Sequence, residues 1–259
     1  MTILAVLQAR TTSSRLPGKV LLPLAGRPMI LRQLERIERA QTIDMVVVAT
    51  SSDASDDELC EVLVAAGYCV VRGSLEDVLG RFIAVIDRFE PDVVVRLTAD
   101  CPLLSPSVVD EVVRAFLSDD ADYVSNTMTP TFPDGIDVEV VRARVLREVA
   151  EIAADPPERE HVTLGVYRRH EQYRIANVTN VRNGIAQDHS HLRWTVDTPE
   201  DFAFVEGVYR ALFETKPAFE YEDVLGYLER NPKATRTSAD SVRNAALIGL
   251  DTGAMSNPS

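Results

Sequence analysis

The sequence lacks several features that mark common classes of protein. Its 259 residues include three cysteines, Cys60, Cys69 and Cys101, which form no Cys-x-x-Cys pair and are too few for a disulfide framework. No apolar run approaches the roughly 18 residues of a membrane-spanning helix. The N-terminus also lacks the basic, apolar and small-residue regions of a signal peptide. We therefore expect a cytoplasmic protein with no membrane partner.

Basic residues are scarce as well. There are 27 Lys and Arg against 40 Asp and Glu, a net charge of −13. A general nucleic-acid binder should present a basic surface, so no nucleic-acid partner is expected. The first 40 residues differ, with seven basic and two acidic residues, which predicts a local anion site inside an acidic protein. Three of those basic residues, Arg32, Arg36 and Arg39, are instead expected on the solvated face of a helix.

The common nucleotide-binding glycine motifs are missing. No Gly-x-Gly occurs in the chain, and the only Gly-Lys pair, Gly18-Lys19, is followed by Val20. A dinucleotide fingerprint and a P-loop are therefore excluded. What is present is an apolar run at 3–7 that leads into a loop containing four hydroxyl residues and the cations Arg10, Arg15 and Lys19. Three converging cations suit a triphosphate, although a basic surface loop is an alternative from these residues alone.

Apolar runs and amphipathic stretches alternate over the first half of the chain. Strands are predicted at 3–7, 44–50, 68–72, 93–97 and 122–125, with helices at 28–40, 55–66, 75–89 and 105–117. This alternation predicts an α/β fold, with a mostly parallel central sheet and helices on both faces. Later strands are expected at 136–141, 173–179 and 192–196, and later helices at 142–153, 158–170, 198–212 and 221–228.

No linker divides the chain. We expect one domain over 1–230 and a C-terminal extension over 231–259. That extension contains a short apolar stretch at 245–250 and ends in residues that we expect to be disordered.

Two aspartates each follow an expected strand. Asp100 comes after the run at 93–97, and Asp197 comes after the run at 192–196. The carboxyl ends of parallel strands border the ligand crevice of an α/β sheet. Mg²⁺ is typically held there by one or two carboxylates together with substrate phosphates. The alternative is that each aspartate only caps the helix that follows it, a role that Thr198 already fills beside Asp197.

Two other groups are disfavoured as sites. Cys101 is a poor candidate nucleophile because Pro102 follows directly and no histidine is near in sequence. His189 and His191 have a metal-ligand spacing, but no third His or Cys lies close. A surface loop is the favoured interpretation of that segment.

The opening loop also carries a resemblance. Residues 7–10 (Leu-Gln-Ala-Arg) and 13–19 (Ser-Ser-Arg-Leu-Pro-Gly-Lys) resemble the signature of the sugar-activating cytidylyltransferases. These include the enzymes that make CMP-activated 3-deoxy-manno-octulosonate and CMP-sialic acid. The chain is most similar to the spore-coat polysaccharide biosynthesis cytidylyltransferase-like group, and the resemblance extends to about Asn244. Further blocks follow in the order of the family at 73–81, 97–103, 133–139, 159–163 and 195–201.

The resemblance implies a nucleotidyltransferase fold of the glycosyltransferase-A type, and it assigns roles to residues. The implied catalytic residues are Lys19, Arg10, Arg15 and Asp100, and the implied Mg²⁺ ligands are Asp100 and Asp197. Nucleotide contacts are implied for Leu7, Gln8, Ala9, Arg10, Arg15, Lys19, Ser74, Asp77, Arg81, Thr98 and Ala99. Acceptor contacts are implied for Phe132, Asp134, Gly135, Asp137, Glu139, Glu160 and His161. Relatives are commonly homodimers, with the contact supplied by residues 126–170.

The hypothesis that follows is Mg²⁺-dependent transfer of CMP from CTP to a sugar or sugar-like acid, with release of pyrophosphate, in polysaccharide or glycoconjugate biosynthesis. A nucleotide-sugar glycosyltransferase would be expected to carry an Asp-x-Asp motif, but Asp100 lies between Ala99 and Cys101. A non-catalytic nucleotide-binding regulator need not keep two metal ligands. The additional basic residues that grip the acceptor carboxylate in sugar-acid enzymes have no match here, which leaves the acceptor open.

Overall fold

A computed structural model describes residues 1–237 of the chain. The apolar stretch at 245–250 and the end expected to be disordered lie outside the described residues. Within 1–237, no helix has the length and apolar character needed to cross a membrane.

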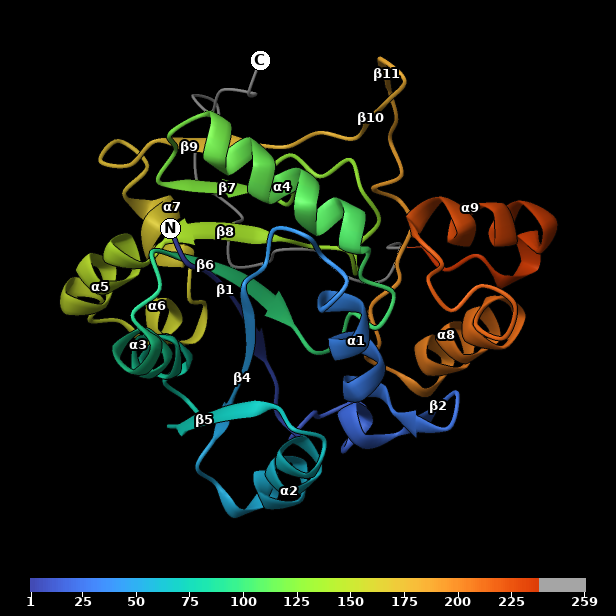
Figure 1. Ribbon diagram of the computed structural model, residues 1–259, viewed down its shortest axis with the longest axis horizontal. Helices are drawn as coiled ribbons and strands as arrows, with labels where there is room; N and C mark the ends of the chain where they lie inside the picture. Colours follow the sequence, from blue (N-terminus) through green and yellow to red (C-terminus); the bar gives the residue numbers. More distant parts are fainter. Residues whose placement is uncertain (238–259) are drawn as a thin grey trace.

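The centre of the molecule is a seven-stranded sheet in the order β5-β4-β1-β6-β8-β7-β9 (Figure 1). Its strands are β1 (Ile3–Gln8), β4 (Met45–Ser51), β5 (Cys69–Gly73), β6 (Val93–Thr98), β7 (Tyr123–Ser125), β8 (Glu139–Arg142) and β9 (Ile175–Asn177). The strands β5, β4, β1 and β6 run parallel to one another, and β8 alone opposes its neighbours β6 and β7. The predicted mostly parallel sheet is confirmed.

Helices cover both faces of this sheet. They are α1 (Met29–Ile37), α2 (Asp57–Ala65), α3 (Val78–Phe89), α4 (Pro106–Ser118), α5 (Ala143–Ile152), α6 (Pro156–Glu160), α7 (Leu164–Arg168), α8 (Pro199–Leu212) and α9 (Tyr221–Arg230). Alternate side chains of a strand point to opposite faces, and β1 is buried on both. Ile3, Ala5 and Leu7 join a core beneath α1, α4 and α8, whereas Leu4 and Val6 join a core beneath α3 and α5.

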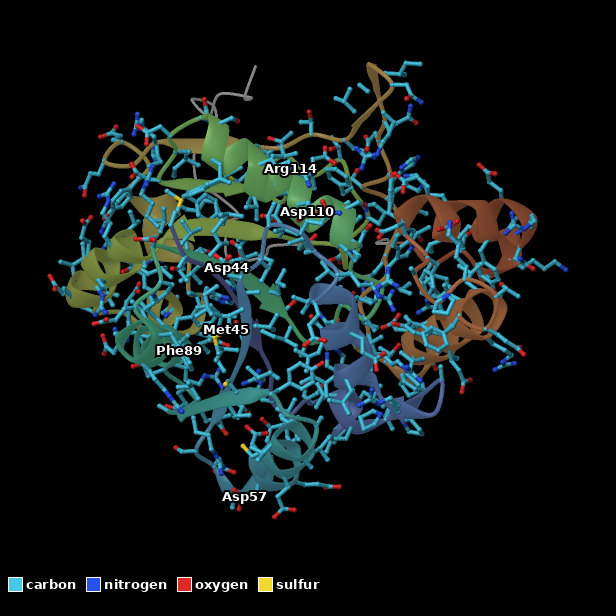
Figure 2. All side chains as sticks on the ribbon, viewed as in Figure 1. Asp44, Met45, Asp57, Phe89, Asp110 and Arg114 are labelled. Atoms are coloured by element: carbon cyan, nitrogen blue, oxygen red, sulfur yellow. The ribbon has the colours of Figure 1, made fainter. Side chains whose placement is uncertain are left out.

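Side chains fill both layers between the sheet and the helices, and Phe89 at the end of α3 packs against the second core (Figure 2). The first core is also covered by α9, which packs on α8. The start of α8 confirms the prediction made for it. Thr198 accepts a hydrogen bond from the Asp201 backbone N–H, and the Asp201 carboxylate accepts one from the Thr198 backbone N–H. Pro199 occupies the first turn.

Three elements differ from expectation. The single helix expected over 158–170 is two short helices, α6 and α7, with a break that lets Thr163 donate a hydrogen bond to Glu139. The strand expected at 192–196 forms only isolated bridges, to Asp134 and Thr237. The strand expected from residue 136 begins at Glu139, because the chain before it bonds to the Asn126 side chain, which donates to the Ile136 carbonyl oxygen and accepts from the Val138 backbone N–H.

Two small hairpins were not predicted. One joins β2 (Pro23–Leu24) to β3 (Arg27–Pro28), and the other joins β10 (Val181–Arg182) to β11 (Ile185–Ala186). The second turns at Asn183-Gly184, both with positive φ. An Asn-Gly pair between two short strands is the strongest sequence signal for a hairpin, so the β10–β11 hairpin could have been predicted.

The expectation that Arg36 lies on a solvated helix face is wrong. Its side chain is fully buried, with Nε 2.6 Å from the Leu104 carbonyl oxygen and Nη2 3.0 Å from the Phe219 carbonyl oxygen. Its guanidinium also stacks 4.2 Å over the Phe219 ring. Burial lowers the pKa of Arg36. Arg36 therefore ties α1 to the start of α4 and to the loop before α9.

Candidate active site

The cationic loop leaves β1 at Gln8 and folds back on itself. The Gly18 backbone N–H donates to the Thr11 carbonyl oxygen at 2.9 Å, and Gly18 has a φ of 71°. Lys19 follows this turn and begins a short 3₁₀ helix, η1 (Lys19–Leu21), and its side chain is mostly buried. The register of the sheet places Gln8 beside Thr98 of β6. The loop therefore meets the Thr98–Asp100 segment at one edge of the sheet.

Asp56 holds the start of this loop by accepting hydrogen bonds from Thr11. This role was not predicted from the sequence. The Thr11 backbone N–H and hydroxyl donate to its Oδ1 at 2.7 and 2.8 Å. The Thr50 hydroxyl, 3.1 Å away, and both the backbone N–H and hydroxyl of Ser51 donate to its Oδ2. Burial acts to raise the pKa of Asp56, but these donors hold the pKa below its usual value. A buried, ionised carboxylate thus joins the loop to the end of β4.

Replacement of Asp56 by alanine is expected to destabilise the fold by about 3 kcal/mol, because several buried donors lose their acceptor. It should also weaken binding of CTP, the nucleotide predicted from the sequence, since Thr11 begins the cationic loop. Urea unfolding and calorimetric CTP titration measure the two effects. The matched control is Asp53→Ala, which removes an exposed carboxylate that accepts from Ser55 in the same turn. Equal effects of the two substitutions would contradict the anchoring role.

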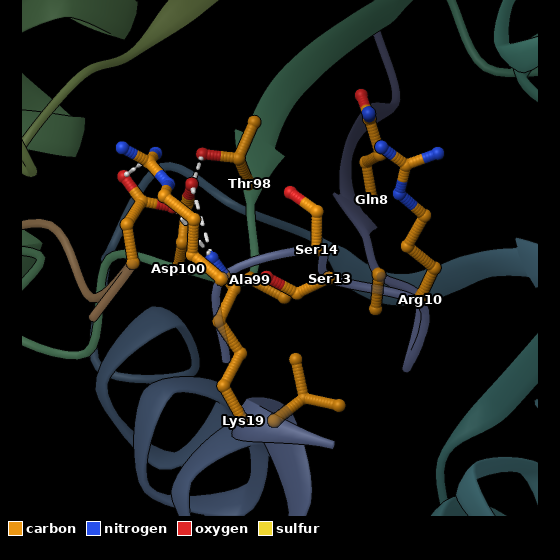
Figure 3. Close-up of a pocket in the computed structure, with 12 residues that line it drawn as sticks. Gln8, Arg10, Ser13, Ser14, Lys19, Thr98, Ala99 and Asp100 are labelled. Atoms are coloured by element: carbon orange, nitrogen blue, oxygen red, sulfur yellow. Dashed lines mark hydrogen bonds and ion pairs between the residues drawn. The ribbon is translucent and has the colours of Figure 1, made fainter. Parts of the chain in front are cut away.

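The loop and the β6 end enclose a first cavity of about 280 Å³. Figure 3 shows Arg10 and Gln8 on one side of it, with Lys19 reaching toward Asp100 on the other. Its lining residues are Gln8, Ala9, Arg10, Ser13, Ser14, Arg15, Lys19, Val20, Thr98, Ala99, Asp100 and Asp197. The structure thus brings together nearly all of the predicted phosphate-side residues.

Lys19 lies between the two predicted metal ligands. Its Nζ is 2.9 Å from Asp197 Oδ1, 3.9 Å from Asp100 Oδ2 and 2.6 Å from the Val196 carbonyl oxygen. Asp197 also pairs with Arg15 at 3.1 Å and with Arg193. Burial acts to raise the pKa of Asp100, but Lys19 and the Thr98 hydroxyl hold it below its usual value. Asp100 is therefore ionised at neutral pH.

The donor set at this point suits Mg²⁺ bound together with a nucleotide. Asp100 and Asp197 offer carboxylate oxygens on either side of one ammonium group, and both are partly exposed to the cavity. Within residues 1–237, no group of three or more His, Cys, Asp or Glu side chains could hold a metal ion. Mg²⁺ needs only one or two carboxylates when substrate phosphates complete its shell.

Two further cavities adjoin the first. The second, about 350 Å³, shares Thr98 and Asp100 with it. The third, about 690 Å³, shares Arg10 with it. The first cavity, with the cationic loop, therefore lies next to both of the others.

The predicted residues divide among these cavities. Ser74 and Asp77 line the third cavity with Arg10. Asp134, Asp137, Glu139 and His161 line the second. Glu160, assigned to the acceptor side, lines the third cavity instead, because α6 ends between the two. Among the cavities described, none is lined by the buried side chains of Leu7, Arg81 and Phe132 or by Gly135.

Arg96 is a second site residue that sequence reasoning missed. It forms a buried ion pair with Glu139, which also accepts hydrogen bonds from Tyr123, Thr163 and Tyr167. Burial acts to raise the pKa of Glu139, but Arg96 and the hydroxyls of Tyr123 and Thr163 hold it below its usual value. A guanidinium inside the apolar run at 93–97 was the signal that could have found it.

The turn at 133–135 is held tightly against the segment at 193–195. The Asp134 backbone N–H donates to the Leu192 carbonyl oxygen, and the Trp194 backbone N–H donates to the Asp134 carbonyl oxygen. Gly135 has a φ of 111°, and a Cβ there would lie 2.7 Å from the Trp194 carbonyl carbon. This close approach places Asp134 and Thr195 in the wall of the second cavity.

Gly135→Ala is therefore expected to lower the free energy of unfolding by roughly 2–4 kcal/mol, from backbone strain and a clash with backbone atoms. Gly184→Ala is the control, because Gly184 also has positive φ but no atom lies within 4 Å of its added Cβ. Denaturant titration of both variants measures the difference. If both variants lose the same free energy of unfolding, the close packing around residue 135 does not contribute to stability.

Comparison with known proteins assigns the family. The family model described as cytidylyltransferase matches residues 4–225. The chain belongs to the cytidylyltransferase family. This membership confirms the predicted enzyme class, a nucleotidyltransferase, and the predicted family resemblance.

Individual cytidylyltransferases and related proteins agree with this. The chain is 34% identical over 244 residues to the spore coat polysaccharide biosynthesis protein SpsF of Bacillus subtilis, covering 92% of this chain and 99% of that protein. It is 37% identical over 122 residues to the 3-deoxy-manno-octulosonate cytidylyltransferase of Pelobacter propionicus, 46% of each chain. The solved structure of a cytidylyltransferase from Leptospira borgpetersenii superposes with a TM-score of 0.84 at 30% identity, covering 90% of this chain and 96% of that one.

Proposed function

We propose that this cytidylyltransferase moves CMP from CTP onto a sugar or sugar-like acid and releases pyrophosphate, in polysaccharide or glycoconjugate biosynthesis. The observation that carries the proposal is that the first cavity shares lining residues with each of the other two. A nucleotide whose base and ribose occupy the third cavity can place its phosphates in the first. Its α-phosphate then lies near Thr98 and Asp100, which also border the second cavity. The second cavity is where the acceptor would bind.

The reaction follows from that arrangement. An acceptor hydroxyl oxygen bonds to the α-phosphorus, the bond from the α-phosphorus to the pyrophosphate oxygen breaks, and the hydroxyl proton passes to water. Catalysis of this kind depends on positioning and on neutralising charge on the phosphate oxygens. Arg10, Arg15 and Lys19 would offset the charge of the departing pyrophosphate. Arg15 and Lys19 each form an ion pair with Asp197 in this structure, whereas Arg10 forms none within residues 1–237.

Mg²⁺ is part of this proposal. Asp100 and Asp197 would hold it, and when bound it would supply Lewis-acid stabilisation of the phosphate oxygens and orient the reactants. We also propose a cytoplasmic homodimer in which residues 126–170 supply the contact. Analytical ultracentrifugation tests the dimer, since a monomer at micromolar concentration would contradict it.

The decisive experiment measures pyrophosphate release with each of the four nucleoside triphosphates, against sugars, sugar phosphates and keto-sugar acids. Release with CTP, dependent on Mg²⁺ and on an acceptor, is the expected result. Mg²⁺-dependent CTP binding without release over the whole panel would favour a non-catalytic regulator. Cleavage of nucleotide sugars instead of CTP would favour a glycosyltransferase.

A further inference from the structure

Arg193 lies beside the proposed metal ligand Asp197 but lines none of the three cavities. Its side chain is only 9% exposed. The guanidinium Nη2 donates a hydrogen bond to Asp197 Oδ2 at 2.5 Å, and Nη1 lies 2.8 Å from Asp201 Oδ1. Arg193 therefore joins a carboxylate that lines the first cavity to one that is fully buried.

Asp201 holds Asp197 in two ways. Its Oδ2 accepts hydrogen bonds from the backbone N–H groups of Asp197 at 3.1 Å and of Thr198 at 2.9 Å. Its Oδ1 contacts Arg193 and also Arg236, at 3.0 Å. A helix cap needs only the bonds between Asp201 and Thr198, so capping does not account for the others. Asp201 fixes the backbone of Asp197 directly and its side chain through Arg193.

Three cations contact the Asp197 carboxylate, and they differ in their freedom to move. Arg15 contacts Oδ2, but its side chain is 58% exposed. Lys19 contacts Oδ1 and also pairs with Asp100. Arg15 and Lys19 both line the first cavity, where a triphosphate would attract them. Arg193 is buried and fixed by a second carboxylate, so its bond to Oδ2 would persist when phosphates bind.

We propose that Arg193 and Asp201 form a positioning pair that holds the Asp197 carboxylate in the orientation needed to bind Mg²⁺. This inference rests on the proposed function and deepens it, because it requires Asp197 to be a metal ligand. Carboxylates that ligate metals are themselves oriented by hydrogen bonds, and loss of such a partner typically costs roughly 10–100-fold in metal affinity. A guanidinium suits this role because its rigid fork of donors can bond two carboxylates at once.

The sign of the effect distinguishes positioning from charge competition. If Arg193 only neutralised Asp197, it would repel Mg²⁺, and its removal would strengthen Mg²⁺ binding. If Arg193 positions Asp197, its removal weakens Mg²⁺ binding. If the pair only stabilised the fold, its loss would lower Tm and leave the Mg²⁺ requirement unchanged.

Calorimetric titration of CTP into the full chain, without acceptor and over a series of Mg²⁺ concentrations, tests the proposal. We expect Arg193→Gln to raise the Mg²⁺ concentration for half-maximal CTP affinity about tenfold, while CTP binding without Mg²⁺ stays unchanged. Asp201→Asn should act in the same direction, because its amide offers no charge to Arg193. That amide still accepts the backbone hydrogen bonds, so this variant keeps the cap and provides the measurement if Arg193→Gln does not fold.

The double variant should need no more Mg²⁺ than the more affected single variant, since both substitutions break one pair. Arg182→Gln is the matched control. Arg182 also links two carboxylates, those of Glu111 at 3.0 Å and Glu222 at 3.1 Å, and it lines none of the three cavities. Its Mg²⁺ requirement should equal that of the wild type.

The outcomes separate this inference from the function on which it rests. An unchanged or lower Mg²⁺ requirement in Arg193→Gln and Asp201→Asn would overturn the inference while leaving CMP transfer intact. A shift of the same size in Arg182→Gln would also overturn it. Failure of the wild-type chain to bind CTP, or CTP binding that does not respond to Mg²⁺, would overturn the proposed function and the inference with it.

Discussion

Pyrophosphate release is expected to fall about 10²–10³-fold when Lys19 is replaced by alanine, the cost of losing one preorganised charged contact to the reacting phosphates. The Lys19 ammonium lies on the cavity that the triphosphate would occupy and is held by the Val196 carbonyl oxygen and by Asp197. Such a fixed group needs little reorganisation when charge develops on the leaving pyrophosphate. The loss should therefore appear mainly in kcat.

The Lys19→Ala protein is expected to remain folded. Asp197 keeps its pairs with Arg15 and Arg193. Asp100 loses its ion pair with Lys19, but its side chain is partly exposed to the cavity and keeps the hydrogen bond from the Thr98 hydroxyl. Lys216→Ala is the matched control, because Lys216 is exposed, pairs with Asp223 and lines none of the three cavities. Steady-state kinetics and thermal unfolding are measured on both proteins. Near-normal release from Lys19→Ala would refute its proposed role at the phosphates.

Much of the fold could be predicted from the sequence because its signals are local. The β-branched runs at 45–51 and 93–98 are strands buried on both faces, which need no information from distant residues. The cap at Thr198 depends only on the three residues that follow it. The segment at 192–196 misled because its backbone bonds to the 133–135 turn rather than to a neighbouring strand, while its apolar side chains are buried in the first core, where Trp194 lies next to Tyr221.

The site was predicted less completely because its contacts join distant residues. Lys19 meets Asp197 across 178 positions, and Arg96 meets Glu139 across 43. Helical spacing put Arg36 among solvated arginines, and only the tertiary fold supplies the carbonyl oxygens of Leu104 and Phe219 that bury it. Asp56 looked like one of several acids at a helix start, yet it alone faces Thr11. The resemblance to the family implied the roles of these residues, and the structure shows which of the three cavities each residue lines.

Asp100→Asn is expected to lower pyrophosphate release by about 10²–10³-fold, because it removes a carboxylate charge at the boundary between the phosphate and acceptor cavities. The amide keeps the shape of the side chain and can still accept the 2.6 Å hydrogen bond from Thr98. The protein should therefore fold normally. If Asp100 holds Mg²⁺ as proposed, the variant should also need a higher Mg²⁺ concentration for half-maximal release.

The Mg²⁺ dependence distinguishes a metal ligand from a partner of Lys19. If Asp100 only oriented Lys19, the Asn variant would lose turnover without any change in the Mg²⁺ requirement, and adding Lys19→Ala would cost little more. A metal ligand instead shifts the Mg²⁺ titration whether Lys19 is present or not. The control is Asp119→Asn at the end of α4, an exposed acid that lines none of the three cavities. If neither Asp100→Asn nor the double variant with Lys19→Ala shifts the Mg²⁺ titration, Asp100 acts as an electrostatic partner of Lys19 and is not a metal ligand.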